Sequence, residues 1–196
     1  ALGYYYGGMI ALSEKNFVES EKYFKQALDV SPNAVEPLNG LVRTYLYQDQ
    51  KAKALAWLDR TIEKYPEHIV AYNIKGEVLL GQKEYAKARD AFQLAIEKRP
   101  EWWIPYRGIA ATWLAQKNEP KAIETYKEAL KNDPKAIKIR NDLALLLDKR
   151  GDHDGAISQY EKILELQKSP AAANNLAMML VTYREDAASV ERALEV

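Results

Sequence analysis

The chain has 196 residues, 47% of them hydrophobic, and its 28 basic and 28 acidic side chains give a formal net charge of zero. The apolar fraction is too high for a disordered segment, and the balanced charge lacks the broad positive field that nucleic acid binding requires. The absence of cysteine excludes disulfides and thiolate metal sites. We therefore expect a folded chain that binds no nucleic acid.

No run approaches the roughly 18 consecutive apolar residues of a membrane span, so we expect a soluble chain with no direct membrane insertion. The opening residues carry no basic stretch before an apolar one, as a secretory signal would. The chain begins without Met in sequence that reads as structured, which favours a fragment of a longer protein.

Four prolines, Pro32, Pro66, Pro100 and Pro134, recur at intervals of 34 residues. Counted from Ala1 as position 1, position 20 reads Ser20, Ala54, Ala88, Ala122, Ala156, and position 24 reads Phe24, Leu58, Phe92, Tyr126, Tyr160. Positions 20, 24, 27 and 28 share one helical face, with small residues where a neighbouring helix must approach closely. The chain is therefore a repeat array.

The period predicts two helices in each repeat, helix A over roughly positions 2 to 14 and helix B over roughly positions 17 to 30. The repeats occupy residues 1–34, 35–68, 69–102, 103–136 and 137–169, followed by a shortened repeat at 170–196. Short turns such as Lys15-Asn16 and Gly151-Asp152 join the helices. Asn118 is placed to cap a B helix, with Pro120 in its first turn.

This pattern resembles the tetratricopeptide repeat (TPR), which has characteristic small, bulky and proline positions. The third repeat matches with Tyr72, Gly76, Ala88, Phe92, Ala95, Pro100, and the fourth with Tyr106, Ile109, Ala110, Trp113, Ala122, Tyr126, Ala129, Pro134. The resemblance implies an all-α fold, a TPR α-solenoid whose helix–turn–helix repeats form a right-handed superhelix. It also implies a concave groove, lined by the A helices, that binds a protein or peptide.

The fifth repeat departs most from the pattern. Arg140 replaces the bulky residue at position 4, Ile163 replaces a small residue at position 27, and the proline comes late, as Pro170. The sixth repeat begins at Pro170, and its second helix is expected at 186–196.

Neither end of the array carries the polar cap that is typical of a solenoid. Apolar side chains of the first helix include Leu2, Tyr4, Tyr6, Met9 and Ile10, and those of the last segment are Val190, Ala193, Leu194 and Val196. Two explanations stay open: the chain is part of a longer array, or its end faces contact another copy in a homo-oligomer.

No catalytic or metal-binding motif is present. His68 and His153 are the only side chains whose ordinary pKa lies near neutrality, and they are expected in separate repeats. Residues 76–83 come nearest to a phosphate loop, but they lack its lysine and hydroxyl and fall inside helix A. We expect no enzyme, no cofactor and no metal.

The resemblance implies that the groove is lined by helix A, chiefly at positions 2, 5, 9, 12 and 13. The candidates for peptide binding are Asn39, Arg43, Asn73, Glu77, Arg107, Leu114, Asn141 and Asn174. An amide both donates and accepts, so the asparagines at position 5 either pair with the main chain of an extended peptide or bond within and between repeats. Leu46, Leu80 and Leu114 either receive partner side chains or are partly buried between A helices.

Trp102 and Trp103 stand at the entry to the fourth repeat, where the TPR pattern has polar or small residues. Aromatic side chains supply recognition area at low entropic cost. These two are a candidate contact site, and the alternative is packing on the preceding B helix.

Two functions stay open. The first is a non-catalytic scaffold that binds a protein or peptide in its groove. A chaperone-binding role is disfavoured, because Arg43, Ile74 and Gly108 stand where TPR domains of that kind carry a carboxylate clamp. The alternative is an architectural module that self-associates or spaces domains, as in bacterial secretion or exopolysaccharide systems, whose repeats the sixth repeat resembles. The compartment, bacterial cytoplasm or periplasm, stays open.

Overall fold

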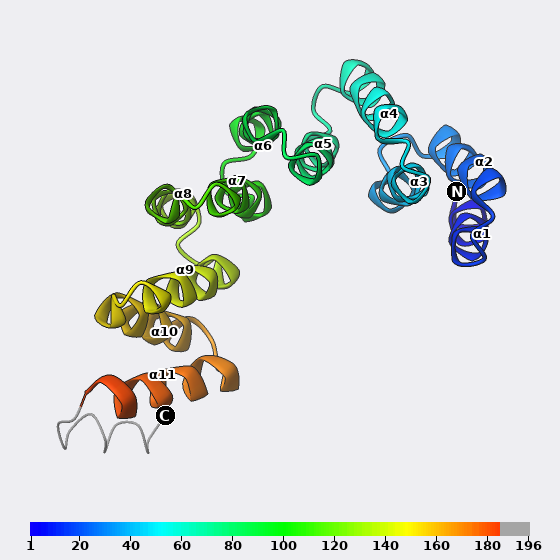
Figure 1. Cartoon of the computed structure of the whole chain (residues 1–196). Coiled ribbons are helices and arrows are strands. Elements are labelled where there is room, and N and C mark those ends of the chain that lie inside the picture. Colours follow the sequence, from blue (N-terminus) through cyan, green and yellow to red (C-terminus); the bar gives the residue numbers. More distant parts are fainter. Residues whose placement is uncertain (185–196) are drawn as a thin grey trace. The chain divides into compact units, whose positions relative to one another are not determined.

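The computed structural model describes residues 1–184. That part of the chain contains eleven α-helices and no strand (Figure 1). The helices are α1 (Leu2–Ser13), α2 (Phe17–Val30), α3 (Val35–Tyr47), α4 (Lys51–Lys64), α5 (Ile69–Gly81), α6 (Tyr85–Lys98), α7 (Trp103–Ala115), α8 (Glu119–Asn132), α9 (Ile137–Lys149), α10 (His153–Leu166) and α11 (Pro170–Tyr183). No helix within residues 1–184 is both long and apolar enough to cross a membrane.

The predicted all-α solenoid of helical pairs is confirmed, and the helices begin and end within about one residue of the predicted bounds. Odd-numbered helices are the A helices and even-numbered ones the B helices. The expected helix at 186–196, with Val190, Ala193, Leu194 and Val196, lies outside the described residues.

The helices fall into two compact units, Ala1–Arg99 with α1 to α6 and a second unit that begins at Pro100. Within each unit, an A helix packs against the B helix that follows it, and that B helix packs against the next A helix. In the first unit α1 also contacts α3, and α3 contacts α5, so the A helices form a layer of their own.

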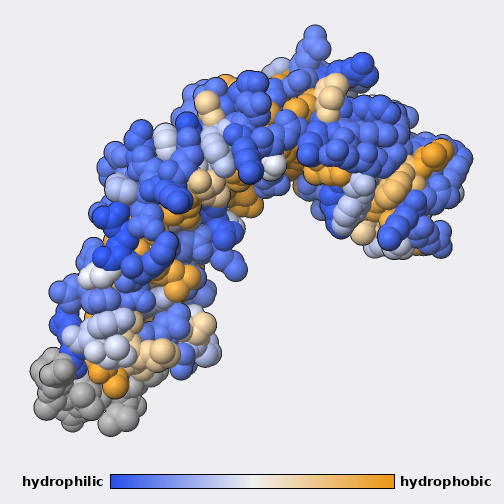
Figure 2. Space-filling view, viewed as in Figure 1, coloured by the Kyte–Doolittle hydropathy of each residue, from blue (hydrophilic) through white to orange (hydrophobic). Residues whose placement is uncertain are grey.

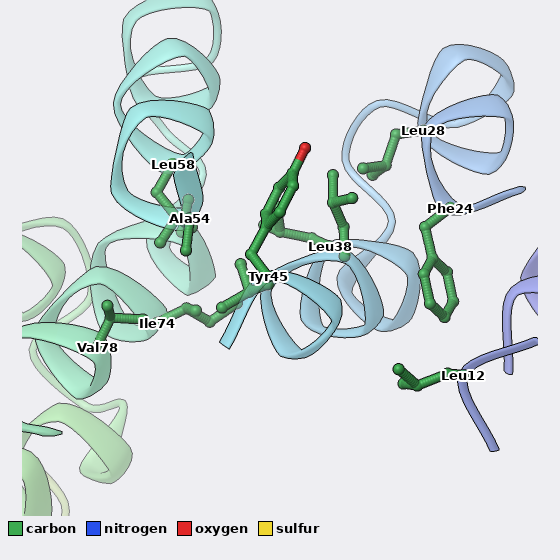
Figure 3. Packing of buried hydrophobic residues seen from close by; sticks show 12 residues of the cluster. Leu12, Phe24, Leu28, Leu38, Tyr45, Ala54, Leu58, Ile74 and Val78 are labelled. Atoms are coloured by element: carbon green, nitrogen blue, oxygen red, sulfur yellow. The ribbon is translucent and has the colours of Figure 1, made fainter. Parts of the chain in front are cut away.

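One aromatic ring joins three helices in the core of the first unit (Figure 3). Phe24 of α2 has no exposed surface, and its ring lies against Gly8 of α1 and Gly40 of α3. A Cβ atom at Gly40 would stand 2.3 Å from that ring, so only glycine leaves room for it there. Small residues therefore set how closely the helices approach one another.

The turn from helix A to helix B has the same backbone in all five repeats. Its second residue is left-handed, with positive φ at Lys15, Asp49, Lys83, Lys117 and Gly151. The next residue donates its N–H to a carbonyl oxygen five residues earlier, as in Asn16 to Ala11 (2.8 Å) and Asp152 to Leu147 (2.9 Å). This is a Schellman motif, which satisfies the last carbonyl groups of helix A.

The predicted cap of α8 is present, since the Asn118 side chain accepts the N–H of Lys121 at 3.2 Å with Pro120 in the first turn.

The structure also gives a role to Arg140, which stands in the fifth repeat where the pattern has a bulky residue. Its guanidinium donates to the carbonyl oxygen of Pro134 from Nη2 (2.7 Å) and to Oε1 of Gln159 from Nη1 (3.0 Å). Arg140 thus ties α9 to the preceding loop and to α10.

Candidate peptide-binding surface

Positions 5, 9 and 12 advance by four and three residues, so they share one face of each A helix. We call this face, within each unit, the A-helix surface. In the first unit it comprises Tyr5, Met9, Leu12, Asn39, Arg43, Leu46, Asn73, Glu77 and Leu80. In the second unit it comprises Arg107, Ala111, Leu114, Asn141, Leu145, Asp148, Asn174, Met178 and Val181.

Large apolar side chains are exposed on this surface. Leu46 is 36% exposed, Leu145 51%, Met178 62% and Val181 59%. Leu80 and Leu114 are half-buried. The leucines predicted at position 12 are therefore partly open to solvent, and Leu145 of α9 and Met178 of α11 are further exposed apolar side chains of the second unit.

The position-5 asparagines differ from one another. Asn73 is only 5% exposed and donates from Nδ2 to Oε1 of Glu77 at 2.8 Å, one turn along the same helix. Its buried Oδ1 has no hydrogen-bond partner among the described residues. Asn39 and Asn141 are half-buried. Asn174 is exposed and its Nδ2 lies 3.9 Å from Sδ of Met178.

Glu77 carries an unusual carboxylate. The residue is exposed by surface area, yet the surrounding protein keeps water from its carboxyl group, and this desolvation raises its pKa despite the hydrogen bond from Asn73 that lowers it. A carboxyl group with a raised pKa binds a proton, or a donor group, more readily than an ordinary one.

Arg107 is engaged in the second unit. Its Nε donates to Oδ2 of Asp142 on α9, and its guanidinium lies 5.7 Å from the ring centre of Trp103. Trp102 and Trp103 are both half-buried. The arginine predicted to bind a ligand therefore already has a carboxylate and an aromatic ring as neighbours.

A hollow of about 580 Å³ opens between α1 and α3. Its lining consists of Met9, Leu12, Ser13, Lys15, Phe17, Arg43 and Tyr47. Of these residues, only Arg43 was among the predicted binding residues. Helical spacing alone points to Met9 at position 9, whereas Lys15 and Phe17 belong to the turn and to α2, where the groove pattern gives no signal.

Within residues 1–184, no three histidine or acidic side chains gather closely enough to hold a metal ion. The described surface instead offers exposed apolar side chains, amides and charged groups, which suit the binding of a polypeptide.

Two family models, both described as tetratricopeptide repeat, match the chain. One covers residues 11–78 and the other covers residues 69–101 and 137–170. Together they match more than half of the sequence, and the chain belongs to the tetratricopeptide repeat family, whose repeats typically form protein–protein interaction scaffolds.

Known proteins support the same assignment. A segment of 83 residues is 32% identical to human Protein O-mannosyl-transferase TMTC3, spanning 42% of this chain and 9% of that protein. Because so little of the transferase is matched, its activity does not carry over. Among solved structures, MamA is 25% identical with a TM-score of 0.58, covering 81% of this chain and 93% of MamA.

Two further structures share the fold. Pseudomonas aeruginosa PilF is 17% identical with a TM-score of 0.64, over 97% of this chain and 87% of PilF. Yeast Tom70 is 21% identical with a TM-score of 0.71, over 98% of this chain and 43% of Tom70.

Proposed function

We propose that the chain is a non-catalytic scaffold that binds a segment of another protein along its A-helix surface. The observation that carries this proposal is the exposure of large apolar side chains at positions 9 and 12 of the A helices, at Leu46, Leu145, Met178 and Val181. Exposed apolar side chains that gather on one face mark interaction sites, because their contact with water is unfavourable and a bound partner removes it.

Polar groups beside these side chains can fix the orientation of a bound segment. Asn141 and Asn174 stand at position 5 on the same two helices as Leu145 and Met178, and their amides can both donate to and accept from a peptide backbone. A bound segment would bury its side chains on the apolar residues and bond its backbone to the amides.

The test places a photo-crosslinking amino acid at Leu145 or Met178 in the full chain and identifies the protein that it captures. The affinity of that purified partner is then measured with Leu145→Glu and with Met178→Glu. We expect binding to weaken at least tenfold, since a buried charge replaces a buried apolar side chain. The matched control is Leu94→Glu, a 44% exposed leucine on helix B of the third repeat. Equal affinity of all three variants would overturn the proposal.

A second candidate function, self-association, rests on α1. This helix has no charged residue, and Leu2, Tyr6 and Ile10 are 66%, 56% and 60% exposed. Figure 2 shows apolar residues reaching the surface where α1 and α2 lie. Sedimentation velocity over a wide concentration range tests it: wild type should form dimers that Ile10→Glu dissolves. A monomer at every concentration would rule this candidate out.

A further inference from the structure

The hollow between α1 and α3 combines an apolar floor with a positive rim. Met9, Leu12 and Phe17 supply its apolar floor. The hollow has a volume of about 580 Å³, which lies within the range of pockets that hold ligand groups. Such a floor accepts an aliphatic side chain, because it removes apolar surface from water on both partners.

The rim has no negative charge of its own. None of the seven lining residues is acidic, and among the described residues neither Lys15 nor Arg43 has an ion-pair partner. Six other lysines of the first unit form ion pairs: Lys22 with Glu19, Lys25 with Glu21, Lys51 with Asp49, Lys75 with Asp59, Lys87 with Glu84 and Lys98 with Glu67. Lys53, Lys64 and Lys83 have no ion-pair partner among the described residues, but none of them lines the hollow. Two unpaired cations beside one hollow attract a carboxylate.

The structure holds the guanidinium of Arg43 and the backbone of Lys15 in place. Arg43 donates from Nη2 to the Tyr47 hydroxyl at 3.3 Å, and its guanidinium lies 5.9 Å from the Tyr47 ring centre. The remaining N–H groups of the planar guanidinium are available to a carboxylate. A guanidinium can bind a carboxylate through two parallel hydrogen bonds. Lys15 sits in the left-handed turn position, whose backbone the Schellman motif fixes.

We propose that this hollow binds an aliphatic side chain of a partner protein together with an acidic side chain next to it, within an internal segment of that partner. The proposal rests on the scaffold function proposed above. An internal segment is favoured over a chain terminus because the A-helix surface continues beyond the hollow, over α3 and on to α5, which α3 contacts. A bound segment can therefore extend past the hollow.

The test uses the full chain with labelled methionine and leucine methyl groups, followed by NMR. The probes are Gly/Ser peptides, acetylated and amidated at their ends, with a central Leu-Glu, Leu-Gln or Ala-Glu pair. We expect Leu-Glu to shift the Met9 methyl signal and to bind up to about fivefold more tightly than Leu-Gln, the upper end of what an exposed charge pair supplies. Ala-Glu should bind roughly tenfold more weakly than Leu-Glu, and added salt should weaken Leu-Glu binding.

Variants identify the cations. Lys15→Gln and Arg43→Gln should each reduce the preference for Leu-Glu over Leu-Gln, whereas Lys83→Gln should not. Lys83 is the matched control because it is exposed and has the same left-handed backbone in the third repeat. Equal binding of Leu-Glu and Leu-Gln, or a Met9 signal that no peptide shifts, would overturn the proposal.

One further arm tests the source of the carboxylate. A peptide that ends in Leu with a free carboxyl group should bind more weakly than the amidated Leu-Glu peptide, and tighter binding would overturn the internal-segment assignment. The outcomes are separable from those of the scaffold proposal. If the hollow fails while Leu145→Glu still weakens partner binding at least tenfold, the scaffold function stands without this specificity.

Discussion

Phe24 shows how a single side chain determines the spacing of three helices. Its ring fills the space that Gly8 and Gly40 leave, and the ring itself has no exposed surface. A ring closed in on several sides cannot move aside for an added methyl group without disturbing its neighbours.

Gly40→Ala should therefore lower the free energy of unfolding by about 1 to 3 kcal/mol, even though alanine is the better helix former. Chemical denaturation followed by circular dichroism measures the change. The control is Gly81→Ala in α5, where a Cβ atom meets nothing within 4 Å. If Gly40→Ala proved as stable as wild type, the packing of Phe24 would be looser than described.

His68 is a buried residue whose imidazole serves as a helix cap. It is 8% exposed, and its Nδ1 accepts the N–H of Ala71 at 3.2 Å at the start of α5. Burial lowers the pKa of His68, although a backbone hydrogen bond raises it in part. The folded chain therefore resists protonation of this ring more than the unfolded chain does.

It follows that His68 makes stability depend on pH. Below pH 6.5 the unfolded chain binds a proton before the folded chain does, so stability falls with decreasing pH until the lowered pKa is reached. The slope is at most about 1.4 kcal/mol per pH unit.

His68→Asn keeps a cap acceptor without an ionisable ring, and urea unfolding at several pH values should show a flatter profile for this variant. Contributions from Glu21, whose pKa is lowered, and Glu77, whose pKa is raised, are common to both proteins and cancel in the difference. Parallel profiles would contradict the assignment.

At the scale of the helical pair, the left-handed turn residue recurs in each of the first five repeats, and among these the fifth alone has glycine there. Lysine or aspartate in this conformation costs free energy, because the Cβ atom crowds the following carbonyl oxygen. Gly151 has φ of +81° and open space around it, so only the backbone conformation, and not crowding by neighbours, calls for glycine at this position.

Gly151→Ala should thus cost about 1 to 2 kcal/mol of stability. Lys117→Ala, at the same turn position of the preceding repeat, should change stability by less than about 0.5 kcal/mol, because a residue with a Cβ atom already occupies that backbone. Thermal unfolding of both variants makes the comparison. Equal losses in the two would show that the turn conformation is not the cause.

The helices were predictable because a period of 34 residues repeats both the buried pattern and the turn signals. Phe24 and Ala54 fall at positions whose packing neighbours are themselves repeated. The side-chain partners on the A-helix surface were not predictable in this way. Asn73 bonds to Glu77 on its own helix, and Arg107 to Asp142 on another, although both residues stand at position 5. The binding role of that surface stays a prediction.

On the scale of the whole molecule, most contacts within each unit follow chain order, from one helix to the next. Repeat proteins of this kind draw their stability from each repeat and its immediate neighbours, so they need not unfold in one step. The two compact units are the natural candidates for separate cooperative blocks.

Hydrogen exchange measured by mass spectrometry on the full chain tests whether the two units unfold separately. Gly40→Ala should lower amide protection in α2 and α3 and their neighbours in the first unit, while α9 and α10 of the second unit keep their wild-type protection. A uniform loss across all described helices would instead indicate one cooperative block.

Gly40 and Phe24 are buried, whereas Leu145 and Met178 are 51% and 62% exposed. At these four positions, the residues that hold the helices together differ from the residues proposed to bind a partner, whereas the hollow between α1 and α3 shares Leu12 with the core. Substitutions at the exposed positions should therefore change what this face can contact, while altering the free energy of unfolding by less than about 0.5 kcal/mol.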